Sequence, residues 1–132
     1  MVLIIHGILD SSDNFAVMKS SVVSYLLDQG HQVWLGNNRG NKYSCTNEKL
    51  DNKSEEFWNY SLDELGGIDF PLFLRTVKQK TGRDKITVIG HSQGGSQIFA
   101  ALSEFPELQD SIGTLPCCNT KTISSDCPQC FT

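Results

Sequence analysis

Short apolar runs alternate along the chain with longer stretches that are bounded by helix start and stop signals. The apolar runs are typical of strands buried on both faces of a parallel sheet. Expected strands lie at residues 2–5, 32–35 and 85–89, and expected helices at residues 14–29, 62–80 and 93–104. This alternation predicts an α/β fold in which right-handed crossovers place helices beside parallel strands.

Turn and cap residues refine these boundaries. Serine and aspartate at residues 11–13 can cap the first helix, and Gly30 ends it. The connection over residues 36–61 is polar and rich in asparagine, so an irregular surface loop is expected there. The glycine pair at residues 66–67 and Pro71 interrupt the second helix, whose first turn is therefore expected to be separate.

The last strand leads directly into the segment GHSQG at residues 90–94, and the third helix follows. A G-x-S-x-G motif between strand and helix is typical of a nucleophile elbow, a sharp turn that raises a serine hydroxyl clear of the sheet. Glycines two residues before and after the serine let the strand and the helix approach closely. This context favours Ser92 as the nucleophile of a serine hydrolase over a structural turn that merely contains a serine.

The end of the first strand carries a second signal of the same chemistry. The apolar run at residues 1–5 breaks at His6 and Gly7, as a buried strand does where it enters a loop. In hydrolases with a nucleophile elbow, this loop gives one backbone N–H to the oxyanion, and the residue after the nucleophile gives the other. We therefore expect the N–H groups of Ile8 and Gln93 to form the oxyanion hole.

Several further motifs share the order and spacing of one known family. The chain has HGILDSS at residues 6–12, VWLGNNRGN at 33–41, EFWNYSLDE at 56–64 and GHSQG at 90–94. Together they resemble the acid lipases, the gastric and lysosomal lipase family of α/β-hydrolases, over about residues 2–112. The resemblance implies a partial, incomplete α/β-hydrolase fold with parallel central strands and flanking helices. It also implies hydrolysis of lipid esters, such as acylglycerols and sterol esters, through an acyl-serine intermediate and without a cofactor.

The histidines depart from that family. In such lipases the catalytic triad follows the order Ser, Asp, His, and its last two members lie well downstream of the elbow. All three histidines here, His6, His31 and His91, precede Ser92 and are interpreted as structural. A serine without a histidine in reach keeps its proton and is a poor nucleophile at neutral pH. The 132 residues therefore lack a recognisable general base.

Two alternatives to an ester hydrolase stay open. One is a catalytically dead fragment that keeps the elbow and acts as a binding or interaction module. The other is a different α/β-hydrolase, such as a thioesterase or a peptidase. An α/β-hydrolase needs roughly 250 residues, so the chain is interpreted as a fragment. Residues 1–112 would form a partial lipase core, and residues 113–132 a cysteine-containing tail that is disordered or misassigned and forms no strand.

Other charged and aromatic residues near these motifs are assigned structural roles. Arg39 is expected to tie its loop by bonding to carbonyl or carboxylate oxygens and not to bind a substrate anion. Asp63 suits a helix start, and Asp69 precedes the elbow, so neither occupies the position of a triad acid. Packing is favoured over an acyl-binding role for four aromatic residues, Trp34, Phe57, Trp58 and Tyr60.

Composition narrows the choice of partners. The formal net charge is −4 and no basic cluster is present, which argues against nucleic acid. No apolar run approaches the roughly 20 residues of a membrane span, and the start of the chain lacks the basic region of a signal peptide. The expected partner is a lipid ester substrate, met at a lipid interface. Localisation stays unknown, although the resemblance implies a lysosomal or secreted protein.

The cysteines are ambiguous. Cys45 stands alone, and the remaining four lie near the end of the chain, at Cys117, Cys118, Cys127 and Cys130. Four thiolates could form a zinc knuckle, but no recognisable finger surrounds them, so no metal is expected. Disulfides would require an oxidising compartment.

Overall fold

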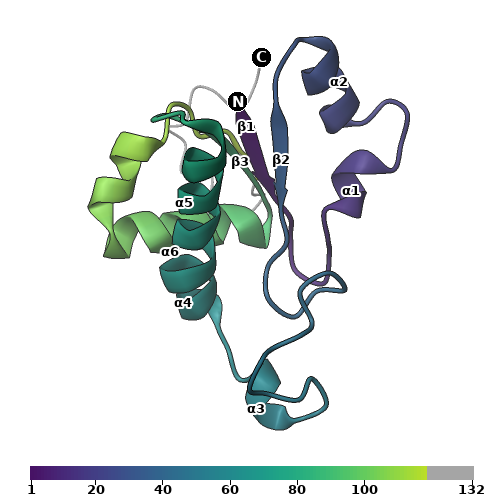
Figure 1. Cartoon of the computed structure of the whole chain (residues 1–132), viewed down its shortest axis with the longest axis vertical. Helices are drawn as coiled ribbons and strands as arrows, with labels where there is room; N and C mark the ends of the chain where they lie inside the picture. The colour runs from purple at the N-terminus through teal and green to yellow at the C-terminus, as the bar shows by residue number, and fades with distance from the viewer. Residues whose placement is uncertain (119–132) are drawn as a thin grey trace.

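The strands form one parallel sheet. The computed structural model describes residues 1–118 of the chain (Figure 1). The sheet has the order β2-β1-β3-β4, in which β1 (Val2–Ile5) lies between β2 (Val33–Gly36) and β3 (Thr87–His91). All pairings are parallel, and β4 (Cys117–Cys118) pairs with β3. The predicted α/β fold with parallel central strands is therefore confirmed.

The register of the sheet aligns the carboxyl ends of its central strands. Ile5 lies opposite Gly36 of β2 on one side and opposite Gly90 of β3 on the other. His6, which follows β1, and Ser92, which follows β3, therefore lie at the same edge of the sheet. Open α/β sheets place their ligand sites at this carboxyl edge.

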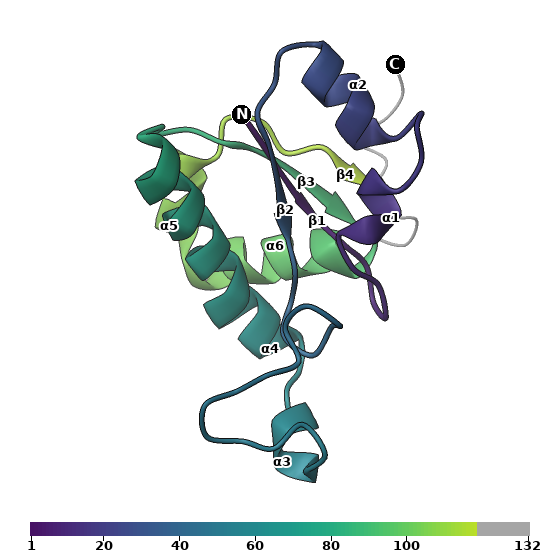
Figure 2. The same ribbon diagram turned by 45° about the vertical axis from the view of Figure 1, so that its right-hand side comes forward.

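Helices cover both faces of the sheet. Their bounds are α1 (Asp13–Ala16), α2 (Val22–Asp28), α3 (Glu55–Trp58), α4 (Leu62–Glu64), α5 (Phe70–Thr81) and α6 (Gln93–Glu104). The π-helical turn η1 (Leu65–Asp69) joins α4 to α5, and the 3₁₀ turn η2 (Pro106–Ser111) follows α6. Figures 1 and 2 show α5 and α6 on one side of the sheet and α1 and α2 on the other.

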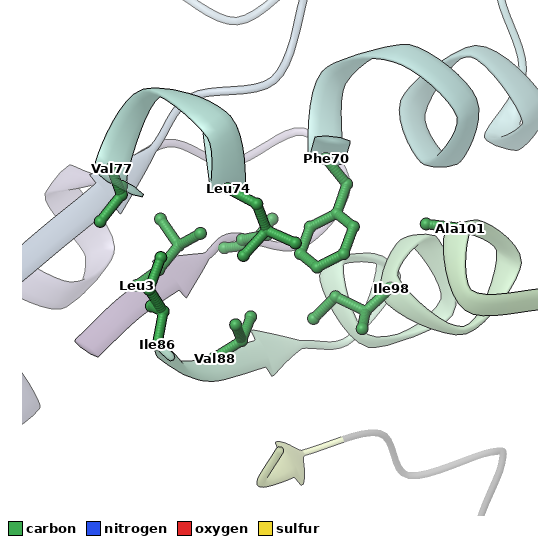
Figure 3. Packing of buried hydrophobic residues seen from close by; sticks show 9 residues of the cluster. Leu3, Phe70, Leu74, Val77, Ile86, Val88, Ile98 and Ala101 are labelled. Atoms are coloured by element: carbon green, nitrogen blue, oxygen red, sulfur yellow. The ribbon is translucent and has the colours of Figure 1, made fainter. Parts of the chain in front are cut away.

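The core lies between the sheet and helices α5 and α6. Phe70, Leu74 and Val77 form one stripe of α5 and are at most 2% exposed. They pack with Leu3 of β1 and Val88 of β3 (Figure 3). Steps of four and three residues are the helical repeat that gives an amphipathic helix one buried face. All of β1 is buried, which accounts for its continuous apolar sequence.

The prediction of one continuous helix over residues 14–29 is wrong, because the helix is interrupted in the middle of that range. The structure has two helices there, α1 and α2, separated by residues 17–21. The Ser21 hydroxyl accepts a hydrogen bond from the backbone N–H of Ser24 at 3.1 Å and caps α2. A serine N-cap starts a new helix, because it satisfies an N–H group that has no partner within the helix.

The next two predicted elements also differ from the structure. The connection over residues 36–61, predicted as loop throughout, contains helix α3. The helix predicted over residues 62–80 does not split after its first turn, since α4, η1 and α5 follow one another without a break. In η1 the Phe70 N–H bonds to the carbonyl of Leu65, five residues back. This wider turn directly precedes Pro71, which a regular helix interior would not accommodate.

The end of the described chain combines a confirmed helix with an unexpected strand. Helix α6 has the bounds predicted for residues 93–104, whereas the strand predicted at 85–89 lies further along, as β3. The expectation that the tail forms no strand is wrong for β4, which pairs with the end of β3. Residues 119–132, with Cys127 and Cys130, lie outside the described residues. The division of the chain into core and tail stays a prediction.

Leu74 and Leu72 provide a matched test of the core. Leu74 is 2% exposed, whereas Leu72 on the same helix is 44% exposed. Leu74→Ala is expected to lower the free energy of unfolding by about 2–5 kcal/mol, because it leaves a cavity. Leu72→Ala should change that free energy by only about 0.5 kcal/mol. Urea unfolding followed by circular dichroism measures both, and equal losses would contradict the packing described here.

Candidate active site

Ser92 occupies a strained turn between β3 and α6. Its φ of 52° and ψ of −117° lie outside the regions that residues with a side chain normally adopt. Such conformations cost about 1–3 kcal/mol and persist only where the surrounding structure holds them. The Ser92 hydroxyl does not cap α6, so the helix makes no structural use of it.

Close backbone contacts require both glycines of the GHSQG segment. A Cβ atom on Gly94 would lie 2.6 Å from the carbonyl oxygen of Ile5 and 2.8 Å from that of His6. A Cβ atom on Gly90 would lie 2.7 Å from the Cα of Gly95. Backbone atoms cannot yield as the far end of a side chain can, so a side chain at either position would separate α6 from the sheet. The turn therefore has the close approach of strand and helix that a nucleophile elbow needs.

The loop after β1 lies directly beside the serine. A Cβ atom on Gly7 would lie 3.2 Å from the Cβ of Ser92, so the Gly7 backbone abuts the serine. In the described part of the chain, neither the Ile8 N–H nor the Gln93 N–H donates a hydrogen bond. Ile8 and Gln93 also line the same cleft. The structure thus brings together the three residues predicted for the site, and their catalytic roles stay a prediction.

His6 is buried and connects this loop to the loop after β2. The residue is 3% exposed. Its Nδ1 lies 2.7 Å from the carbonyl oxygen of Gly7, and its Nε2 lies 3.1 Å from the backbone nitrogen of Asn38. The side-chain nitrogen of Asn41 lies 3.0 Å from the same Nε2. Both ring nitrogens therefore have partners within the two loops.

An ion pair anchors the loop after β2. The Arg39 guanidinium donates to the Asp69 carboxylate from Nε at 2.9 Å and from Nη2 at 2.7 Å, and the Arg39 backbone N–H donates at 3.1 Å. Hydrogen bonding to Asp69 raises the pKa of Arg39. The Tyr60 hydroxyl donates to the Arg39 carbonyl at 3.1 Å, and burial raises the pKa of this phenol. Arg39 is therefore the loop-tying residue predicted from the sequence.

Asp63 lies in the first turn of α4, as predicted.

A cleft of about 640 Å³ opens beside the loop after β1. Its apolar lining includes Ile8, Leu9, Trp58, Leu62 and Leu65. Trp58 and Tyr60, for which only packing is predicted, both line the cleft, whereas Trp34 packs against the core. The cleft combines these apolar walls with polar lining residues such as Asn41 and Ser61 and is also lined by Gln93, the neighbour of Ser92. Such a mixture is suited to a ligand that has an apolar chain and a polar group.

The buried asparagine of the loop after β2 is the part of the site that sequence reasoning misses. Asn38 is 3% exposed, and its Oδ1 accepts a hydrogen bond from Nε2 of the fully buried Gln97 at 2.9 Å. The same Gln97 nitrogen donates to the carbonyl of Leu65 in η1 at 2.8 Å. The signal in the sequence is a group of asparagines at residues 37–41, a pattern equally typical of any polar loop.

The described residues bring no histidine to Ser92 as a base. His6 uses both ring nitrogens in the contacts given above. His31 precedes β2 and so lies at the opposite edge of the sheet. The His91 ring packs edge-on against Phe15, with ring centroids 6.1 Å apart. The structural interpretation of the histidines agrees with these positions.

The described part of the chain has neither a metal-binding cluster nor a membrane-spanning helix. Among the side chains of residues 1–116, no group of three or more His, Cys, Asp or Glu is placed to hold a metal ion. No helix in that range has the length and hydropathy needed to cross a membrane. Cys45 is a partly buried free thiol. Two of the four tail cysteines lie outside the described residues, so the zinc and disulfide alternatives stay open.

Gly94 and Gly113 test the close approach of α6 to the sheet. A Cβ atom on Gly113 would meet its nearest neighbour, the Cβ of Lys85, at an ordinary 3.7 Å. Gly94→Ala is expected to lower the free energy of unfolding by about 1–3 kcal/mol through overpacking. Gly113→Ala should change it by about 0.5 kcal/mol. Thermal unfolding of both variants measures the difference, and wild-type stability of Gly94→Ala would show that the contact is not tight.

Comparison with known proteins agrees with the fold described above. Residues 1–126 match a family model described as the alpha/beta hydrolase fold. Among solved structures, the chain resembles an extracellular alpha/beta-hydrolase from a Paenibacillus species, with a TM-score of 0.56 and 22% identity. The match covers 88% of this chain and 38% of that one. This structural likeness concerns the fold.

Relatives with higher sequence identity are named lipases. Identity is 43% over 110 residues to a probable lipase of Schizosaccharomyces pombe, 40% over 111 residues to gastric triacylglycerol lipase of Rattus norvegicus, and 38% over 114 residues to lysosomal acid lipase/cholesteryl ester hydrolase of Homo sapiens. The matches cover 81%, 83% and 85% of this chain, but 25%, 28% and 29% of those proteins. The chain thus spans little more than a quarter of the length of these relatives. The resemblance to gastric and lysosomal acid lipases is confirmed, and the chain belongs to the α/β-hydrolase fold family.

Proposed function

We propose that this chain supplies the nucleophile and the oxyanion hole of a serine hydrolase that cleaves carboxylic esters of lipids. In this proposal the Ser92 oxygen attacks the ester carbonyl, the alcohol leaves, and water then hydrolyses the acyl-serine. The N–H groups of Ile8 and Gln93 donate to the oxyanion that forms in each step. The reaction needs no cofactor.

The observation that carries the proposal is the contact between the Gly7 backbone and Ser92. It places the loop that bears the Ile8 N–H against a serine in a strained turn, where a Cβ on Gly7 would lie 3.2 Å from the serine Cβ. Acyl transfer needs N–H donors that are aimed at the developing oxyanion and are not used elsewhere. A purely structural turn requires neither the strain at Ser92 nor a free N–H in the neighbouring loop.

The proposal requires a general base from outside the 132 residues. All three histidines precede Ser92, and the described structure gives each of them another position or another partner. A serine is activated when an adjacent base accepts its proton. In this proposal a histidine and an acidic partner from another segment complete the site at the carboxyl edge of the sheet.

The proposed substrates are lipid esters. Two of the relatives are named a triacylglycerol lipase and a cholesteryl ester hydrolase. On this chain, Ile8 and Leu9 line the cleft and are strongly exposed, and Leu62 and Leu65 add apolar wall. Burial of such side chains against an acyl chain removes apolar surface from water and is favourable. The same exposed residues favour contact with a lipid interface.

A fluorophosphonate tests the nucleophile directly, because it bonds to an activated serine oxygen with loss of fluoride. In the full-length protein that carries this chain, peptide mass spectrometry should find the adduct on Ser92. Ser92→Ala should abolish labelling and lower kcat/KM for a lipid ester by at least about 10³-fold. Ser11→Ala, which removes a serine that lines the cleft, should be labelled like the wild type. Lipid ester hydrolysis with an adduct on a different serine would overturn the proposal, and absence of both labelling and hydrolysis would favour the interaction module.

The isolated 132-residue chain tests the source of the base. Purified alone, it is expected to hydrolyse a p-nitrophenyl ester no faster than its Ser92→Ala variant, because no base accepts the serine proton. Initial rates followed by absorbance compare the two. A large turnover that depends on Ser92 would place the base within the chain, and His91, the adjacent residue, would then be substituted first.

A further inference from the structure

We infer that His6 is a positioning residue whose ring holds the peptide group between Gly7 and Ile8, so that the Ile8 N–H points toward the oxyanion. The inference rests on the proposed function, because it explains how one of the two oxyanion donors is oriented. In this role His6 acts through a backbone carbonyl and not on the substrate.

The partners of the ring determine which of its nitrogens carries the proton. The Gly7 carbonyl can only accept, so Nδ1, at 2.7 Å, must donate. The Asn38 backbone N–H can only donate, so Nε2, at 3.1 Å, must accept. The side-chain N–H of Asn41 also points to Nε2, at 3.0 Å. A ring with its proton on Nδ1 fits these partners, because Nδ1 then donates to the Gly7 carbonyl and the single lone pair of Nε2 faces the two N–H groups.

A hydrogen bond to the Gly7 carbonyl sets the direction of the Ile8 N–H. The two groups belong to one planar peptide unit, and in a trans unit the C=O and the N–H point in opposite directions. No cis peptide bond occurs in the described chain. With its carbonyl turned toward the His6 ring, the unit turns its N–H away from the ring, where it meets no acceptor among the described residues. Gly7 abuts Ser92, so this free N–H belongs to the part of the loop nearest the serine.

The ring can orient the peptide only if the ring itself is fixed. His6 is 3% exposed, and the Asn38 N–H holds the nitrogen that lies farther from Gly7. The next residue, Arg39, is held through its side chain and its backbone N–H by Asp69 at the end of η1. A continuous set of contacts therefore runs from the helix on one side of the site to the oxyanion loop.

The loop beyond this peptide has little side-chain packing to support it. Leu9 has a φ of 56°, which residues with a side chain rarely adopt, and it is fully exposed. After it, the Asp10 carboxylate accepts the backbone N–H of Ser11 at 2.7 Å. The Asp10 carboxylate also accepts from the side-chain amide of Asn14 at 2.8 Å. Polar contacts of His6 before Ile8 and of Asp10 after it thus hold this turn.

Three substitutions separate the two contacts of the ring. His6→Asn places an amide N–H near the position of Nδ1, where it can still donate to the Gly7 carbonyl, but offers nothing at the position of Nε2. His6→Gln reaches the position of Nε2 and can accept from the Asn38 N–H, but has no donor at the position of Nδ1. His6→Ala removes both contacts.

The assay uses the full-length protein that carries this chain, with an ester and the matching thionoester, in which sulfur replaces the carbonyl oxygen. Sulfur accepts hydrogen bonds weakly, so the ratio of the two kcat values reports on the oxyanion hole. In His6→Ala and His6→Gln, kcat for the ester is expected to fall about 10²-fold, the lower end of the range for losing one oxyanion donor, with KM within about twofold of wild type. The preference for the ester should shrink in the same two variants. His6→Asn should keep that preference and a kcat within about tenfold of wild type.

Equal kcat values in His6→Asn and His6→Gln would overturn the positioning role. Variants that have a lower melting temperature but the kcat of the wild type would overturn it as well. These two variants decide the question even if His6→Ala does not fold. A wild-type protein that the fluorophosphonate does not label at Ser92 would instead overturn the proposed function. A labelled wild type whose His6→Gln variant keeps full kcat and the full ester preference would overturn only the role of His6.

Discussion

The close approach of α6 to the end of β1 is the contact on which the site depends. A Cβ atom on Gly94 would lie 2.6 Å from the carbonyl oxygen of Ile5, so the helix can begin there only if the side chain is a hydrogen atom. Because β1 and β3 are paired in register up to Ile5 and Gly90, this approach sets Ser92 beside the loop that leaves β1. The strained Ser92 turn and its contact with Gly7 both follow from it.

Hydrogen bonds and an ion pair hold the loops at this edge of the sheet, whereas apolar packing holds the sheet against α5 and α6. His6, Asn38 and Gln97 are each at most 3% exposed and are joined by hydrogen bonds. Removing one partner of a buried polar group costs about 1–3 kcal/mol, which disfavours other loop conformations. The ion pair between Arg39 and Asp69 anchors the outer end of these contacts. Apolar packing alone would hold the loop in place without setting the direction of a single N–H group.

The sequence predicts the parts of the molecule that short-range rules decide. An apolar run marks β1, and the elbow motif marks Ser92 and the start of α6. The break before α2 is missed, because a serine such as Ser21 fits an exposed helix position as well as a cap. The pairing of β4 and the bonds of His6 are missed for another reason. His6 meets Asn38, 32 residues away, and a contact over that distance depends on the register of the sheet and not on local sequence.

The most direct test of this account is a crystal structure of the full-length protein with a phosphonate bound to Ser92. The phosphonyl oxygen that represents the oxyanion should accept hydrogen bonds from the backbone N–H groups of Ile8 and Gln93, with nitrogen to oxygen distances of about 2.7–3.1 Å. A phosphonate on Ser92 whose oxygen lies out of reach of both groups would contradict it.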